Sequence, residues 1–343
     1  MKKKKIPWGP IYVVLTFAVL LVFGFVNREF VSVFSVASGL PLGFLAAAVL
    51  MTAVFLVMEG EIIRLLLRCQ GERVGFWTTL KIGLIGIYYS YITPSSTGGQ
   101  PAQVMYLRRD RVLPGSSAAV LFVKFFAYQS AFVLCCIGSL IYMYPALQAE
   151  KPQLIPAAII GTAINALWVI GIPLLFCPPV LHGLCGLIVK LLDRCRFLRK
   201  RAVWIEKMRG FEQDFADYTQ RFRKKLRYVV LAVLLSIPQA VLQMSVLYVV
   251  FLAFGSEALY AELLSMQTLL QAAVCFMPMP GASGAQEIGF SVFFDGYFPS
   301  SGMLYTAVLV WRFFTYYIIV IAGAVLVMAD QLLYRKKKLN EIF

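Results

Sequence analysis

The chain has 343 residues, of which 60% are apolar and 14% are charged, and its formal net charge is +15. This composition is typical of a polytopic membrane protein. Seven cysteines without CxxC spacing and one histidine, His182, exclude a disulfide framework and a zinc site. The positive charge does not indicate a nucleic-acid partner, because the basic residues flank apolar runs, as membrane orientation requires.

Apolar runs of about 17 or more residues predict six full membrane crossings. The first run reads as an uncleaved span rather than a signal peptide, because no small-residue cleavage site follows it. The expected crossings are residues 10–26, 42–58, 116–144, 155–177, 228–254 and 303–329.

Two further apolar stretches, residues 75–106 and 261–298, each contain the same kind of seven-residue pattern. It reads Pro94-Ser-Ser-Thr-Gly-Gly-Gln100 the first time and Pro280-Gly-Ala-Ser-Gly-Ala-Gln286 the second time. Because proline and glycine break helices, each stretch is predicted as helix, break, helix, entering and leaving the membrane on one side. Broken backbone at membrane depth has to be buried in protein or line a wet cavity, so the pattern indicates a site.

The positive-inside rule tests this arrangement, since short basic loops stay in the cytoplasm. If the first broken stretch crossed fully, Arg108, Arg109 and Arg111 would lie outside, so a re-entrant hairpin is preferred. Both termini are then cytoplasmic, and the two hairpins enter from opposite sides. Five basic residues are then not cytoplasmic: Arg28 and Lys151, which are external, and Lys81, Lys124 and Arg312, which lie within the membrane.

Each hairpin is preceded and followed by a full span, so one unit occurs twice with opposite orientation. The expected fold is an all-α polytopic membrane protein, with six full transmembrane helices and two oppositely inserted re-entrant helical hairpins in an inverted repeat. It forms a single domain over residues 1–343. Inverted repeats that meet at the bilayer midplane are a transporter architecture, in which broken helices build the substrate site. The alternative is that both patterns are hinges in ordinary spans and are alike by chance.

Arg312 is expected near the midplane, where a guanidinium costs at least ~2.5 kcal/mol unless it faces a partner or water. Glu287, directly after the second pattern, is the acid expected at the same depth. The two form either a plain internal ion pair or a split site, in which the arginine grips a phosphate bidentately and the glutamate attracts a cation. Lys124 and Lys81 are expected to snorkel to the inner surface.

The breaks themselves are expected to bind a phosphate with neighbouring polar groups. Helix ends expose amide donors, side chains add hydroxyls and amides, and glycines keep the backbone approachable. In the alternative, the same polar residues hold helices together. Beside Arg312 and Glu287, the candidate substrate-binding residues are Ser95, Ser96, Thr97, Gly98, Gly99, Gln100, Ser283, Gly284 and Gln286. No catalytic residue, metal ligand or cofactor is predicted.

Residues 178–227 form a basic cytoplasmic segment with an amphipathic helix inside it. Apolar residues recur there at steps of four and three, which predicts one apolar helix face: Trp204, Met208, Phe211, Phe215, Tyr218 and Phe222. The helix is expected to lie on an anionic membrane surface, with its apolar face docked on the bundle or on a second copy as the alternative. The basic residues expected at that surface are Arg221, Arg223, Lys224, Lys225 and Arg227.

With these motifs the chain resembles the lysylphosphatidylglycerol synthase transmembrane, or flippase-like, domain family. The resemblance rests on residues 93–101 with Arg108 and Arg109, on residues 279–287, and on Arg312. It implies a bacterial plasma-membrane protein that acts on phospholipid. In larger relatives it implies movement of aminoacylated phosphatidylglycerol to the outer leaflet, which reduces the attraction of the cell for cationic antimicrobial peptides.

Family members that synthesise this lipid carry a soluble transferase domain, and that domain is not expected here. Only residues 330–343 follow the last predicted span, which is too short for a transferase. The chain could still serve a separately encoded synthase.

Three function classes therefore stay open. The leading one is a phospholipid flippase or lipid transporter, with headgroups in the polar cavity between the hairpins and acyl tails in lipid. The second is an intramembrane enzyme with Glu287 as general base, which usually needs a second acid, a histidine or a metal within reach. The third is an accessory subunit without turnover, and a homo-oligomer is also possible.

Overall fold

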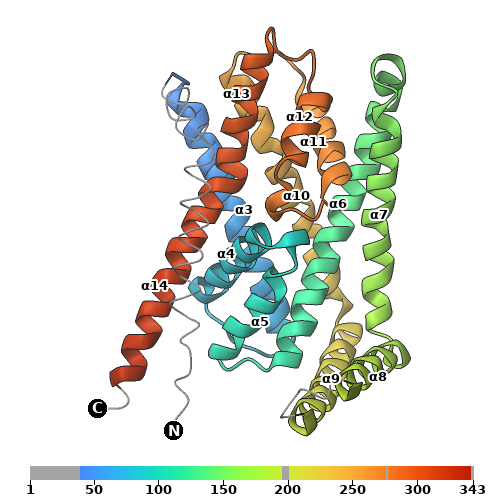
Figure 1. Ribbon diagram of the computed structural model, residues 1–343, viewed down its shortest axis with the longest axis vertical. Helices are drawn as coiled ribbons and strands as arrows, with labels where there is room; N and C mark the ends of the chain where they lie inside the picture. The colour runs from blue at the N-terminus through green and yellow to red at the C-terminus, as the bar shows by residue number, and fades with distance from the viewer. Residues whose placement is uncertain (1–38, 195–200, 276, 341–343) are drawn as a thin grey trace.

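The computed structural model describes residues 39–194, 201–275 and 277–340, and this part of the chain is helical without strands (Figure 1). The predicted span 10–26 lies outside the described residues. The elements are α3 (Leu42–Cys69), α4 (Phe76–Ile92), η1 (Pro94–Ser96), α5 (Gly99–Arg109), α6 (Pro114–Glu150), α7 (Leu154–Leu175), α8 (Pro178–Arg194), α9 (Arg201–Lys224), α10 (Leu226–Ala253), α11 (Tyr260–Val274), η2 (Pro280–Ala282), α12 (Ala285–Phe293), α13 (Ser301–Arg312), η3 (Phe313–Tyr317) and α14 (Ile318–Asn340).

Five helices of the described part are long and apolar enough to cross a membrane, so the chain is a multi-pass membrane protein. They are α3, α6, α7, α10 and the stretch Gly302–Leu333, which joins α13, η3 and α14. Each corresponds to one of the crossings that hydropathy predicts, although α7 and α10 end two residues and one residue before the predicted ends of their spans. The helix α3 runs eleven residues beyond the predicted end of its span, because residues such as Ile63 and Leu66 keep an apolar face buried past the first charges.

The helices approach one another closely at small residues, as is common in membrane bundles. A Cβ atom on Gly60 of α3 would lie 2.8 Å from the Cα of Leu80 in α4. A Cβ atom on Gly161 of α7 would lie 2.5 Å from the carbonyl oxygen of Ala272 in α11. These contacts hold α4 and α11, the first arms of the two broken segments, against full-length helices.

Both predicted breaks are present. The helices α4 and α5 pack against each other on either side of η1, and α11 and α12 do the same on either side of η2. In Figure 1 the first pair lies in the lower half of the bundle and the second pair in the upper half. The two breaks, η1 and η2, contact each other. The two patterns, far apart in the sequence, therefore meet inside the bundle.

The helices α8 and α9 pack on each other at the lower end of the bundle in Figure 1, below α7. The apolar face of α9 is directed at the bundle: Phe215 and Phe222 are each 2% exposed, and Phe215 contacts the ring of Phe122 in α6 edge to face. This is the docked arrangement that the sequence left open as an alternative to a lipid-facing helix.

Three of the basic residues predicted to face anionic lipid also bind helix ends. Arg221 donates to the carbonyl of Gln70 at 3.2 Å, and Lys225 donates to that of Cys69 at 3.0 Å. Arg223 donates to the carbonyl of Phe176 at 2.8 Å. These carbonyls belong to the ends of α3 and α7, where the helix leaves acceptors unpaired. Binding of this cluster to anionic lipid stays a prediction.

Candidate functional site

The two breaks share a backbone conformation as well as a sequence pattern. The residue before each proline is extended, with φ −112° and ψ 144° at Thr93 and φ −108° and ψ 146° at Met279. Each proline then opens one 3₁₀ turn. The next helix begins five residues after the proline in both cases, at Gly99 and at Ala285. The repetition therefore extends from residue types to chain geometry.

Both turns contain residues in the left-handed region of φ and ψ. In the first break these are Ser95 and Ser96, with φ 50° and 55°, and in the second Gly281 and Ala282, with φ 59° and 50°. A residue with a side chain pays about 1–3 kcal/mol for a sparsely populated conformation of this kind. Such strain persists only where the surrounding structure imposes it, and it concentrates at functional sites.

The two breaks differ after this turn in the φ angle of a glycine and in the side chain that accepts its N–H. In the second break that side chain is an acid. Gly284 adopts φ 84°, whereas the equivalent Gly98 has φ −82°. The N–H of Gly284 donates to Oε2 of Glu287 at 2.5 Å, so the carboxylate caps the first turn of α12. In the first break the corresponding N–H of Gly98 donates to the hydroxyl of Thr93 at 2.9 Å.

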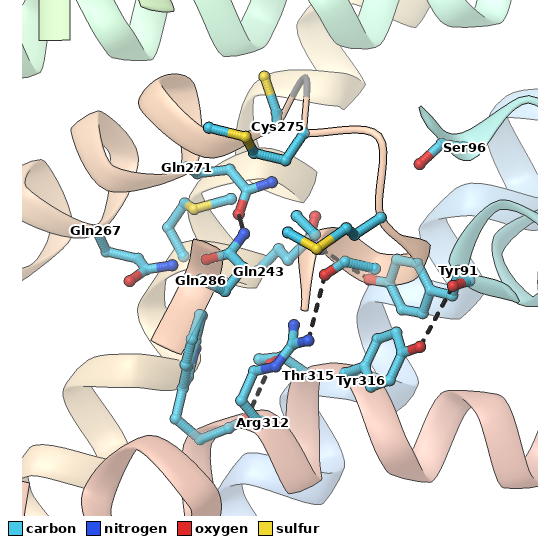
Figure 2. Close-up of a pocket in the computed structure, with 16 residues that line it drawn as sticks. Tyr91, Ser96, Gln243, Gln267, Gln271, Cys275, Gln286, Arg312, Thr315 and Tyr316 are labelled. Atoms are coloured by element: carbon cyan, nitrogen blue, oxygen red, sulfur yellow. Dashed lines mark hydrogen bonds between the residues drawn. The ribbon is translucent and has the colours of Figure 1, made fainter. Parts of the chain in front are cut away.

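Arg312 ties the last long helix to the second break. It lies at the end of α13, its exposed fraction is 4%, and its Nε lies 2.9 Å from Oε1 of Glu287. Its Nη2 donates to the hydroxyl of Ser283 at 2.9 Å and to the carbonyl of Gly281 at 3.2 Å. Figure 2 shows Arg312 beside Tyr316 and Thr315 at the cavity. The guanidinium carbon lies 4.4 Å from the centre of the Tyr316 ring. The expected internal ion pair is therefore present.

The pair is close without being a fully formed hydrogen bond. Nε of Arg312 is buried, and its N–H finds no hydrogen-bonded acceptor despite the short distance to Glu287. Arg312 and Glu287 therefore attract each other as opposite charges, although the N–H of Nε does not point at the carboxylate oxygen. The guanidinium thus keeps donor capacity beyond its bonds to Gly281 and Ser283.

A π-helical turn, η3, follows Arg312 directly. Such a turn widens the helix and frees a backbone group, and it is common at functional sites. Here the hydroxyl of Thr52 in α3 donates to the carbonyl of Phe314 at 3.2 Å. The hydroxyl of Tyr316, in the same turn, donates to the carbonyl of Tyr91 at the end of α4 at 3.3 Å. The π turn therefore connects the last helix to the first break.

A cavity of about 130 Å³ lies where these elements meet, enough for several water molecules. Methionines and Trp311 form part of its wall, and the amides of four glutamines, the phenol of Tyr91 and the guanidinium of Arg312 supply its polar groups (Figure 2). The four glutamines are Gln243, Gln267, Gln271 and Gln286.

Several polar atoms at this cavity are buried without a hydrogen-bond partner. They include Oε1 of Gln267, Oε1 of Gln286 and Nε1 of Trp311. Of the four glutamines in the cavity wall, Gln286 and Gln271 are hydrogen-bonded to each other: Nε2 of Gln286 donates to Oε1 of Gln271 at 2.7 Å. Buried polar groups are normally paired, so these atoms are hydrogen-bonding groups in the cavity wall whose capacity is unused in this arrangement. Within the described residues, no group of three or more His, Cys, Asp or Glu side chains is placed to hold a metal ion.

The structure brings the predicted residues of the second break together around Arg312. Arg312 and Gln286 line the cavity, together with Ser96 from the first break. Ser283 and Glu287 contact Arg312 directly, and Gly284 provides the left-handed turn between them.

The remaining residues of the first break do not line this cavity. Ser95 and Thr97 are exposed, and Thr97 donates to the carbonyl of Pro94 in its own turn at 3.0 Å. Gly98 and Gly99 lie where a side chain would collide with the end of α4 or with the residue after it. A Cβ atom on Gly98 would lie 2.6 Å from a carbon of Thr93, which follows α4, and one on Gly99 would overlap the hydroxyl of Ser90 in α4. The half-buried Gln100 follows them in α5.

The sequence reasoning missed a second buried charge cluster. Lys124 does not snorkel to the surface: its ammonium pairs with Oε1 of Glu59, which is 2% exposed, and Gln239 donates to the other oxygen at 2.9 Å. Glu59 lies one residue past the predicted end of its span, which is why it was not counted as an intramembrane acid. Lys81 pairs with Asp330 at 3.0 Å instead of lying free.

Comparison with known proteins gives one family. The family model described as the lysylphosphatidylglycerol synthase TM region matches residues 11–323. The chain is also 24% identical over 298 residues to a UPF0104 membrane protein of Archaeoglobus fulgidus, an alignment that covers 82% of this chain and 84% of that protein. No solved structure matches the chain.

Proposed function

We propose a function for this chain from one premise: it belongs to the family of the lysylphosphatidylglycerol synthase transmembrane region. That membership supports a role in membrane lipid biology. The proposed function is movement of phospholipid, with aminoacyl-phosphatidylglycerol as a candidate substrate, between the leaflets of a bacterial plasma membrane. The observation that carries it is a buried arginine, Arg312, at the wall of a polar cavity where two strained helix breaks meet.

The proposed membrane arrangement has six crossings and two re-entrant hairpins, α4–α5 and α11–α12, inserted from opposite sides. Their positions in opposite halves of the bundle and the contact of η1 with η2 support it (Figure 1). The lower end in Figure 1 carries α9 and the end of α5, which are basic, whereas the loop from α12 to α13 at the upper end carries Asp295. By the positive-inside rule the lower end would be cytoplasmic, and we propose the same side for both termini.

A lipid phosphate would be held by exchange with the internal ion pair. Arg312 now has the carboxylate of Glu287 as its counter-ion, and a phosphate offers the same guanidinium a bidentate partner. The hydroxyl of Ser283 and the N-terminal amides of α12 lie beside that position and favour an anion. The released carboxylate would then bind the amine of an aminoacylated headgroup.

The first break would have a different part in this scheme. Ser96 would contact the headgroup from the opposite wall of the cavity, since it is the residue of that pattern in the lining. The exposed Ser95 and Thr97 would lie on the path to it, with Gln100. Gly98 and Gly99 would act by letting α4 and α5 pack closely at the break.

An intramembrane enzyme that uses Glu287 as general base is less well supported. One carboxylate oxygen of Glu287 faces Arg312 and the other accepts from the N–H of Gly284, so a base role would first require a ligand to release the carboxylate. A general base of this kind also usually needs a second acid, a histidine or a metal within reach, and in the part of the chain that the structure describes no group of three or more His, Cys, Asp or Glu side chains is placed to hold a metal ion. Mass spectrometry of defined lipids after incubation with the protein separates the two classes. A chemically changed lipid would favour the enzyme.

The transport proposal is tested in proteoliposomes that contain headgroup-labelled phospholipid. The parent protein is expected to move the label between leaflets, and Arg312→Ala to reduce the rate at least about tenfold, as the loss of a charged hydrogen-bonding anchor does. Arg64→Ala is the matched control, because Arg64 pairs with Glu61 on the partly exposed face of α3. Equal rates for the parent and a folded Arg312→Ala variant would refute the site.

A further inference from the structure

A second charge cluster lies inside the bundle, separate from the Arg312 site. Glu59 of α3 is 2% exposed, one of its oxygens pairs with the ammonium of Lys124 in α6, and the other accepts from Gln239 in α10 at 2.9 Å. Gly83 of α4 leaves the space that the glutamate occupies, since a Cβ atom there would lie 3.0 Å from its Cγ. Ionisable residues within spanning helices are costly, and they commonly mark ion pathways or proton relays.

A second layer of polar side chains lies next to this cluster, one helical turn nearer the cavity. Tyr128 lies one turn after Lys124 on α6, and Gln243 lies one turn after Gln239 on α10. The hydroxyl of Tyr128 donates to Oε1 of Gln243 at 2.7 Å, and Nε2 of Gln243 donates to the hydroxyl of Tyr91 at 3.5 Å. Gln243 and Tyr91 both line the Arg312 cavity. Polar side chains on two consecutive turns of α6 and α10 therefore lie between the buried acid and the cavity.

The groups around Glu59 come from each helix packed against α3. Among the described residues, Lys124 of α6 forms an ion pair with it, and Tyr128 of α6 and Tyr91 of α4 are close enough to interact with it electrostatically. The helix α10 faces it with the neutral amide of Gln239. The π turn η3 meets α3 at Thr52, about two turns away.

We propose that Glu59 is a proton-binding site that couples proton uptake to headgroup binding at Arg312. This rests on the proposed transport function and adds its coupling ion. Both oxygens of Glu59 are engaged and buried, so the site as it stands admits a proton but no larger ion. A proton from the aqueous phase would add to the carboxylate oxygen that now faces Lys124, giving a neutral carboxyl group.

Protonation changes the charge balance next to the cavity. The pair of Glu59 and Lys124 is neutral overall as it stands, and it carries one positive charge once the acid is protonated. In a medium of low dielectric constant that charge favours an anion at the Arg312 cavity. By linkage, a phosphate bound there favours protonation of Glu59 by the same factor. Lipid and proton would therefore move together.

The experiment uses the full chain in proteoliposomes with labelled phospholipid, with and without an imposed pH gradient and with the membrane potential clamped. The gradient is expected to change the rate of leaflet exchange by about fivefold or more. The Glu59→Gln variant and the double variant Glu59→Gln with Lys124→Met, which leaves no unpaired charge, are expected to lose this response. Glu61→Gln, an acid of α3 paired with Arg64 on the partly exposed face, is expected to keep it.

A second measurement does not depend on transport. Infrared difference spectra recorded over a series of buffer pH values are expected to show the carbonyl band of a protonated carboxyl group. That band should be absent in both Glu59 variants and present in Glu61→Gln.

Two results would overturn the coupling proposal: a spectrum that does not depend on Glu59, or lipid movement that responds equally to the gradient in the double variant. Lipid movement without any gradient response would overturn it too, while leaving the transport function intact. Absence of lipid movement in the parent would instead refute transport, and the spectra would still decide whether Glu59 binds a proton.

Discussion

Nε of Arg312 and Oε1 of Glu287 lie 2.9 Å apart, although one residue ends α13 and the other lies in the first turn of α12. The same carboxylate accepts the N–H of Gly284 at 2.5 Å through its other oxygen. One side chain thus joins the last long helix to the second break and closes the turn of that break. A ligand that takes Arg312 from Glu287 would loosen both contacts together.

Removing the charge of Glu287 should destabilise the protein and make it sensitive to anions. In Glu287→Gln the amide keeps the shape and can still accept from Gly284, but Arg312 loses its counter-ion in a buried position. We expect a loss of about 1–3 kcal/mol, measured as a lower thermal unfolding midpoint in detergent. Anionic phospholipid should raise the unfolding midpoint of the variant more than that of the parent, because the lipid phosphate replaces the missing carboxylate. A variant with an unchanged midpoint, or one that anionic lipid does not help, would contradict this role.

The turn of the second break should not tolerate a side chain at Gly281. Its φ of 59° disfavours other residues, and a Cβ atom there would overlap the ring of Tyr316, which stacks on Arg312. Gly281→Ala is expected to cost about 2 kcal/mol or more and to slow lipid movement. Gly138→Ala is the matched control, since Gly138 is in the helical part of α6 with no atom within 4 Å of its Cβ position. That change should stabilise the helix by about 0.5–1 kcal/mol. Equal midpoints for the two variants would show that the turn is not strained.

The two broken segments should start from opposite sides of the membrane. Trp77, in the first turn of α4, is 77% exposed, and Leu259, directly before α11, is 66% exposed. In a background without native cysteines, Trp77→Cys should react with a membrane-impermeant thiol reagent only from the cytoplasmic side. Leu259→Cys should react only from the outside. Labelling of both positions from one side would rule out oppositely inserted hairpins.

Hydropathy and helix-breaking residues predicted most of the architecture. The five spans of the described residues follow from apolar runs, and the breaks at Pro94 and Pro280 follow from the inability of proline and glycine to continue a helix. These signals are local in the sequence, so they can be recognised without knowledge of the tertiary packing.

The pairing of buried polar residues could not be predicted in the same way. Which face of a helix turns inward depends on all its neighbours, so Glu59, Gln239 and Gln243 gave no local indication that they meet Lys124, Tyr128 and Tyr91. Their presence in otherwise apolar helices was a usable signal, because polar residues within spans are rarely incidental. The π turn after Arg312 had no such signal, and its hydrogen bonds to α3 and to the end of α4 join residues that are far apart in the sequence.

The central claim is that a phospholipid headgroup occupies the cavity where the two breaks meet. Photo-crosslinking with a lipid that carries the reactive group on its headgroup, followed by mass spectrometry of the labelled peptides, tests it directly. We expect label on peptides that contain the cavity residues Gln271 and Gln286, strongly reduced in Arg312→Ala. Label confined to the outer faces of the long helices, or cavity label unaffected by Arg312→Ala, would contradict the claim.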